Sequence, residues 1–115
     1  MLETSSDKLA TLIEEGADVV DVRTPDEWRT TGVIPESHLL TFFDNRGNYD
    51  LNDWLSKFTK LADPEDEVVI ICAVGNRSRV ISQFLSSKLG YQKVHNVTQG
   101  IEHWIGSGHP VNKWP

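Results

Sequence analysis

The sequence predicts an α/β fold, an open parallel sheet of about four to five strands with helices on both faces. The first observation is the apolar, β-branched run at residues 68–71, which suits a strand buried on both sides. The second is the regular alternation of helix-period and strand-like segments along the chain, which is typical of parallel strands joined by right-handed crossovers. A length of 115 residues allows one hydrophobic core, so we expect a single domain over residues 1–115.

The first two elements are a short helix and a strand. Ser5 and Ser6 are N-cap candidates for an amphipathic helix that carries Leu9, Leu12 and Ile13 on one face and stops at Gly16. Residues 19–22 then read as a buried strand. Asp21 and Arg23 lie near its carboxyl end, and we expect them to form a structural ion pair or to bind loop backbone rather than to take part in catalysis.

The next segment predicts a brief helix, a strand and a long loop. Thr24 and Pro25 begin the helix with acidic residues in its first turn, and it stops near Gly32. Residues 38–41 can form the next strand. Residues 42–50 carry turn-forming residues and read as a loop. Its aromatic side chains and Arg46 either wall an active site or pack on the surface, and the sequence leaves both readings open.

The second half of the chain repeats the helix and strand alternation. Residues 51–61 place apolar side chains on one helical stripe, and the acidic link at residues 63–67 leads into the central strand. After a loop, a helix-period pattern continues to Leu89 and ends at Gly90. Residues 94–97 predict a last short strand. We expect Thr98 to cap a final helix that ends at residues 106–108.

Cys72, the only cysteine, follows the central strand and precedes a helix N-terminus. Ligands of open α/β sheets bind at this edge, where unpaired N–H groups and the helix dipole favour an anion. Gly75 lets the loop turn its N–H groups inward. With further positive charge from Arg77 and Arg79, we expect Cys72 to be held as a nucleophilic thiolate. A buried, inert cysteine would need none of these neighbours.

The spacing Cys-x-x-Gly-x-Arg-Ser at residues 72–78 resembles the active-site loop of the rhodanese sulfurtransferase family. The resemblance extends to the Asp-Val-Arg and Glu-Trp segment at residues 21–28, to Gly-Val-Ile-Pro at residues 32–35, and to C-terminal segments near residues 90–94, 98–104 and 108–111. Together these cover about residues 19–111. The chain departs from the family pattern at Val33, where histidine is usual, at Glu36 and Ser37, where Gly-Ala is usual, and at Gln99, where glycine is common.

The resemblance implies a rhodanese-like fold and a sulfurtransferase. Cys72 would attack the outer sulfur of a small anionic donor such as thiosulfate and form a persulfide. Cyanide, a thiol or a protein acceptor would then take that sulfur, with no cofactor. Substrate binding would fall to the rest of the loop, whose backbone N–H groups stabilise the persulfide anion: Ala73, Val74, Gly75, Asn76, Arg77 and Ser78.

Two other functions remain open at this point. A Cys-dependent phosphatase or arsenate reductase also places an arginine after its cysteine and before a helix, but one residue further along than Arg77 stands from Cys72. A non-catalytic persulfide carrier or docking module would hand sulfur to a partner protein. Reaction with free thiosulfate, compared with reaction with protein acceptors, would separate that carrier from the enzyme.

The composition excludes several classes of partner. A net charge of −6 argues against nucleic acid, whose phosphates need clustered lysine and arginine. One cysteine excludes an internal disulfide, and the four histidines lack the spacing of zinc ligands, so we expect no metal. No run approaches the ~20 apolar residues of a membrane span. We expect a cytoplasmic protein, or a periplasmic one if a signal peptide has been removed, and a monomer or weak dimer.

Overall fold

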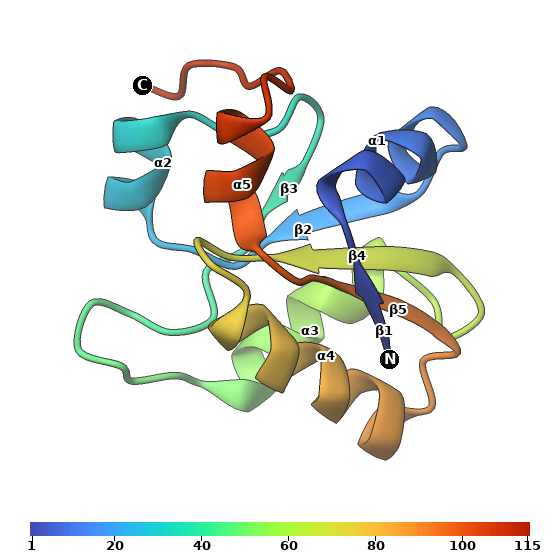
Figure 1. Ribbon diagram of the computed structural model, residues 1–115. Coiled ribbons are helices and arrows are strands. Elements are labelled where there is room, and N and C mark those ends of the chain that lie inside the picture. Colours follow the sequence, from blue (N-terminus) through green and yellow to red (C-terminus); the bar gives the residue numbers. More distant parts are fainter.

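The computed structural model describes all residues from 1 to 115 and contains one five-stranded parallel sheet in the order β1-β5-β4-β2-β3. The predicted fold class is therefore confirmed (Figure 1). The elements in chain order are β1 (Leu2–Thr4), α1 (Ser6–Glu14), β2 (Asp18–Asp21), α2 (Pro25–Thr31), β3 (His38–Leu39), α3 (Leu51–Leu61), β4 (Glu67–Ile71), α4 (Asn76–Leu89), β5 (Lys93–Val97) and α5 (Gly100–Gly106).

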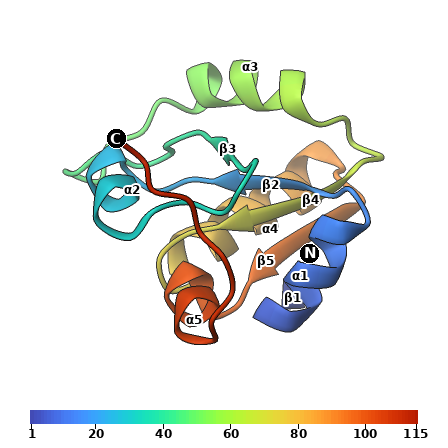
Figure 2. The same cartoon turned by 90° about the horizontal axis from the view of Figure 1, so that it is seen from above.

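The central strand β4 is buried on both faces, as its sequence predicts. Val68 and Ile70 pack into one apolar cluster, with α3 and α4, whereas Val69 and Ile71 pack into a second, with α1 and α5. All four side chains are fully buried. Figure 1 shows the sheet with α1 and α5 on one side and α3 and α4 on the other, and Figure 2 shows α3 and α5 on opposite sides of it. Burial of each such side chain stabilises the fold by roughly 1.5–3 kcal/mol, so the strand that leads to Cys72 is anchored in the core on both of its faces.

The strand β1 was not predicted. It pairs with β5 at the edge of the sheet, with Leu2 opposite His95 and Thr4 opposite Val97. Three residues are too few for an alternating pattern to show in a sequence, so the register of this strand depends on its neighbour. The strand predicted at residues 38–41 is also shorter than expected and covers only His38–Leu39.

Local capping explains where several helices begin. The side chain of Ser5 accepts the Lys8 N–H at the start of α1. Thr24 and Glu27 form a reciprocal capping box around the first turn of α2.

No helix in the structure is both long and apolar enough to cross a membrane.

The prediction that Thr98 caps the last helix was wrong. The N-cap of α5 is Gln99, with no side-chain hydrogen bond, and the Thr98 hydroxyl donates instead to Glu3. The helix begins at Gly100, whose φ of 67° and close approach to the Ala73 carbonyl place the turn one residue later. The close packing of Gly100 against the loop at Ala73 therefore determines where α5 begins. The capping preference of Thr98 does not.

The C-terminal segment runs beside α2 (Figure 1). Val33 and Asn112 form an antiparallel bridge, and the Trp114 ring meets the Trp28 ring edge-on at 5.3 Å. The guanidinium of Arg29 lies over the same Trp114 ring. These contacts hold α2 in place next to the Cys72 loop.

Candidate active site

Cys72 lies where its position after β4 predicts, at the carboxyl edge of the sheet and directly before α4. The loop turns at Gly75, the N-cap of α4, which has a φ of 100°. A Cβ atom at Gly75 would overlap the Thr98 carbonyl, so only glycine fits this turn. Cys72 itself is 1% exposed. The thiol is thus buried beneath a closely packed loop.

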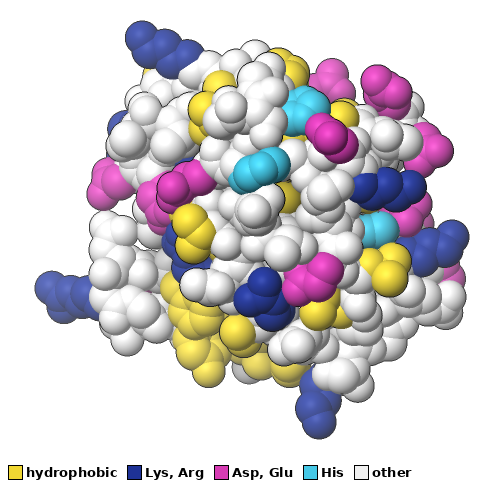
Figure 3. Space-filling model, viewed as in Figure 1, with side chains coloured by type: hydrophobic (Ala, Val, Ile, Leu, Met, Phe, Trp, Pro, Cys, Tyr) yellow, Lys and Arg dark blue, Asp and Glu magenta, His cyan; other side chains and the backbone are white.

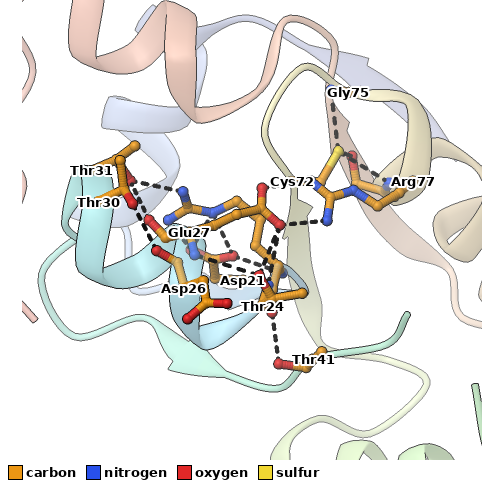
Figure 4. A network of polar contacts seen from close by, with 12 residues as sticks. Asp21, Thr24, Asp26, Glu27, Thr30, Thr31, Thr41, Cys72, Gly75 and Arg77 are labelled. Atoms are coloured by element: carbon orange, nitrogen blue, oxygen red, sulfur yellow. Dashed lines mark hydrogen bonds and ion pairs between the residues drawn. The ribbon is translucent and has the colours of Figure 1, made fainter. Parts of the chain in front are cut away.

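Three groups contact the sulfur. The Gly75 N–H donates to Cys72 Sγ at 3.2 Å, and the Ser78 N–H does so at 3.4 Å (Figure 4 shows the loop and labels Cys72 and Gly75). The Ser78 hydroxyl lies 3.2 Å from the same sulfur. Backbone N–H groups at a helix N-terminus stabilise negative charge on a bound atom. The site can therefore hold a sulfur anion at Cys72.

The other predicted loop residues have different surroundings. The Ala73 carbonyl accepts the Glu102 N–H at 3.1 Å, which ties the loop to α5. Val74 is half-exposed, and Asn76 is exposed on the first turn of α4. The cradle that faces the sulfur thus consists of the N–H groups of Gly75 and Ser78.

Arg77 makes a bidentate ion pair with Glu27 of α2. Nη1 and Nη2 each donate to one carboxylate oxygen, both at 2.8 Å. The hydrogen bonds from Arg77 hold the pKa of Glu27 below its usual value, and the same pair raises the pKa of Arg77. Figure 4 shows the two side chains reaching toward one another across the gap between α2 and α4.

Arg79 is also paired, through Nε to a Glu3 oxygen at 2.8 Å. Arg77 and Arg79 carry the positive charge that was expected beside the loop, but each also faces a carboxylate that offsets part of it. Those carboxylates come from α2 and β1, far away in the sequence, so local sequence could not indicate them. Besides the hydrogen bonds to Glu27, negative charge at Cys72 is among the causes that raise the pKa of Arg77, so the guanidinium favours an anionic sulfur together with the backbone N–H groups and the helix dipole.

The expected ion pair of Asp21 and Arg23 is confirmed. Arg23 Nη2 lies 2.9 Å from an Asp21 oxygen, and both side chains are 1% exposed. Arg23 also donates to the Thr31 hydroxyl and to the Gly32 carbonyl, at the far end of α2. The pair therefore anchors α2 to β2, as a scaffold for Glu27, and contacts no atom of Cys72.

The aromatic residues of the 42–50 loop pack beside the site. Phe42 and Tyr49 stack with their ring centroids 5.3 Å apart, and Phe42 meets Trp54 of α3 edge-on. Arg46 is exposed. The loop and α4 enclose an apolar pocket of about 200 Å³, lined by Phe42, Phe43, Tyr49, Leu51, Val80, Ile81 and Phe84. Figure 3, drawn in the same view as Figure 1, shows hydrophobic side chains gathered at the lower left of the molecular surface.

Sequence reasoning missed two residues of the site. The sequence predicts Glu27 as an acid in the first turn of a helix and as part of the Glu-Trp segment that resembles the family, but not as the partner of Arg77. Asn96 is fully buried in β5 and accepts a hydrogen bond from the Ser78 hydroxyl. A polar residue near the end of an otherwise buried strand was the available signal for Asn96.

Known proteins resemble this chain in sequence and in fold. The family model described as "Rhodanese-like domain" matches residues 5–107. The chain is 29% identical over 107 residues to thiosulfate sulfurtransferase 18 of Arabidopsis thaliana, covering 89% of this chain and 76% of the relative. It is 30% identical over 86 residues to thiosulfate sulfurtransferase GlpE of Tolumonas auensis, covering 75% and 70%. The crystal structure of a rhodanese-related protein from Thermoplasma volcanium is similar with a TM-score of 0.76 and 30% identity, covering 99% of this chain and 100% of that one. The chain therefore belongs to the rhodanese-like domain family.

Proposed function

We propose that this protein is a sulfurtransferase that moves a sulfane sulfur from thiosulfate or another donor to cyanide or a thiol through a persulfide on Cys72. The observation that carries the proposal is the pair of backbone N–H groups, from Gly75 and Ser78, that donate to Cys72 Sγ at the N-terminus of α4. A thiolate at that position is stabilised in place and directed toward the edge of the sheet where ligands of this fold class bind.

The reaction needs two displacements and no external oxidant. The Cys72 thiolate attacks the outer sulfur of thiosulfate, a new S–S bond forms, and sulfite leaves with the electron pair of the broken bond. The acceptor then attacks the terminal sulfur of the persulfide, and Cys72 leaves as a thiolate. Each step conserves charge and returns the enzyme to its starting state.

Arg77 supports donor binding in this proposal. A guanidinium carries five N–H groups, and the pair with Glu27 uses one on each of its two terminal nitrogens. The remaining N–H groups can donate to an oxyanion of the donor at the mouth of the loop. Because Glu27 offsets the charge of Arg77, we expect affinity for a small dianion to be modest.

That charge pairing also favours a second candidate, a persulfide carrier that exchanges sulfur with a partner protein. In a carrier, shape and contact area at the loop would replace free positive charge as the source of affinity. Steady-state rates with cyanide, compared with those for a small protein thiol, separate the two. A carrier would form the persulfide but turn over only with the protein acceptor.

A phosphatase is the less favoured alternative. Arg77 stands five positions after Cys72, so the loop has one residue fewer than in related phosphatases. A smaller ring of N–H groups suits a single sulfur better than the oxygens of a phosphate. We expect no hydrolysis of an aryl phosphate by the wild type, and efficient hydrolysis without sulfur transfer would move the chain to that class.

The decisive experiment is intact mass spectrometry. Wild-type protein should gain one sulfur from thiosulfate and lose it on addition of cyanide. The matched control is Cys72→Ser, which removes the only thiol and should gain nothing. Absence of an adduct on the wild type, or an equal adduct on the control, would contradict the proposal.

A further inference from the structure

A chain of polar side chains runs from Cys72 to the edge strand β1. Cys72 Sγ lies 3.2 Å from the Ser78 hydroxyl, and that hydroxyl donates a short hydrogen bond to Asn96 Oδ1. Asn96 Nδ2 in turn donates to Glu3 Oε1 at 2.7 Å. Ser78 and Asn96 are both fully buried. Four segments of the chain therefore meet in one line of hydrogen bonds that ends at the thiol.

The orientation of the Asn96 amide is determined by its neighbours. Nδ2 faces two groups that can only accept, the Glu3 carboxylate at 2.7 Å and the Gly75 carbonyl at 3.3 Å. Turning the amide over would set Oδ1 against both acceptors and leave them without a donor. Oδ1 must then face Ser78, where it can accept a proton but has none to give.

Glu3 is itself held in position. Burial raises the pKa of Glu3, but hydrogen bonds from Arg79, Asn96 and Thr98 outweigh it, so the net pKa is lowered. The side chain is therefore a carboxylate at neutral pH. Arg79 Nε binds its second oxygen at 2.8 Å. The carboxylate is thereby a fixed acceptor for the Asn96 amide.

This arrangement determines where the one hydroxyl proton of Ser78 can go. While it is donated to Asn96, the Ser78 oxygen presents a lone pair to the sulfur and can only accept from a protonated Cys72. To donate to a thiolate, Ser78 must turn away from Asn96 and leave a buried carbonyl oxygen without a donor. A buried acceptor without a donor is unfavourable, so this orientation of the hydroxyl is disfavoured.

We infer that Asn96, held by Glu3, is a positioning residue that directs the Ser78 proton away from Cys72 and so restrains ionisation of the resting thiol. The inference rests on the proposed function, since it concerns the nucleophile of that reaction. The backbone N–H groups of Gly75 and Ser78 favour the anion, as does the Arg77 guanidinium, which is itself paired with Glu27. The Asn96 contact opposes it. The balance protects a lone thiol from indiscriminate reaction until a donor occupies the loop.

The test measures Cys72 alkylation by iodoacetamide as a function of pH, with intact mass as the readout. Asn96→Ala frees the Ser78 proton for the sulfur, so the pH midpoint of alkylation should fall by about one unit, the equivalent of one hydrogen bond to a charged group. The double variant Ser78→Ala/Asn96→Ala should have the same pH midpoint of alkylation as the single variant Ser78→Ala. This double-mutant cycle isolates an effect that passes through the hydroxyl.

Two further variants protect the test against loss of structure. Thr98→Val removes another donor to Glu3 but leaves the Asn96 contacts, and its midpoint should equal that of the wild type. Glu3→Gln lets the Asn96 amide turn over, because a glutamine can supply an N–H, and should lower the midpoint by a smaller amount. Near-ultraviolet circular dichroism checks that each variant is folded.

The inference is overturned if Asn96→Ala leaves the midpoint unchanged or raises it, or if it shifts the midpoint equally in both Ser78 backgrounds. Failure of the proposed function is a separate result. It would show as absence of sulfur uptake from thiosulfate by the wild type, whatever the alkylation profile.

Discussion

Replacing Glu27 by glutamine removes the carboxylate that faces Arg77 and keeps an acceptor oxygen in the same place. Glutamine also satisfies a capping box at this position, so the start of α2 should survive the change. The substitution therefore tests the ion pair alone. We expect the variant to be less stable than the wild type near neutral pH and equal to it in acid.

The structure sets the size of the effect. The two side chains are 30% and 31% exposed, and the pair is bidentate, with both N–O distances at 2.8 Å. Exposed pairs are worth about 0–1 kcal/mol, and good geometry with partial burial places this one near the upper end. We expect Glu27→Gln to lower the free energy of unfolding by about 1 kcal/mol near neutral pH.

The pH dependence has a definite sign. The pKa of Glu27 is lowered from 4.5 in the folded state, first by hydrogen bonds from Arg77. A lowered carboxyl pKa gives stability that is fully present above the unfolded value of 4.5 and is lost as pH falls through the lower folded value. The difference between wild type and variant should thus shrink as the pH falls below 4.5 and vanish once the pH is well below the lowered pKa of folded Glu27.

The assay is urea unfolding followed by tryptophan fluorescence, since Trp28 is buried on the same helix as Glu27. Glu102→Gln is the matched control, because it removes a carboxylate near the same loop, where Glu102 lines a cavity with Glu27 and Ala73. The control should show no such pH-dependent difference. A Glu27→Gln deficit that is the same at neutral and acid pH would refute the reasoning and assign its cause to packing or capping.

Three further predictions follow from single contacts. Arg77→Ala should reduce kcat/KM for thiosulfate by about tenfold, because it removes one charge-assisted hydrogen bond to the donor. The variant should still melt in one cooperative transition, and collapse of the fold would show that Arg77 is structural. Asp21→Asn should cost about 3–5 kcal/mol in urea unfolding, because it leaves the buried Arg23 guanidinium without its counter-charge. A loss near zero would mean that its neutral acceptors suffice. Glu36→Gly should raise the melting temperature, because Glu36 is exposed at a φ of 65° and a residue with a side chain costs about 1–2 kcal/mol in the left-handed region. The greater backbone entropy of glycine in the unfolded chain offsets only part of this gain. An unchanged or lower melting temperature would show that this turn is not strained.

The order of helices and strands follows from local patterns in the sequence. The four β-branched residues of β4 predict a strand buried on both faces, and the stripe of α3 predicts its single buried side. Thr24 and Pro25 predict the start of α2. These features depend on neighbours within a few positions, so a sequence can carry them. The three-residue β1 has no such pattern and depends entirely on pairing with β5.

The place of Cys72 after the central strand was also determined by sequence, because the carboxyl end of a parallel strand and the following helix N-terminus form an anion site in any such fold. The partners of its loop were decided only by the tertiary structure. Arg77 meets Glu27, fifty positions earlier, and Asn96 of β5 meets Glu3 of the neighbouring edge strand β1. Such contacts depend on which strands become neighbours and on how closely the helices approach. The paired side chains are far apart in the sequence and come within hydrogen-bond distance only in the folded chain. The sequence alone therefore located the candidate nucleophile, and the fold determined which charged groups and hydrogen-bond donors surround it.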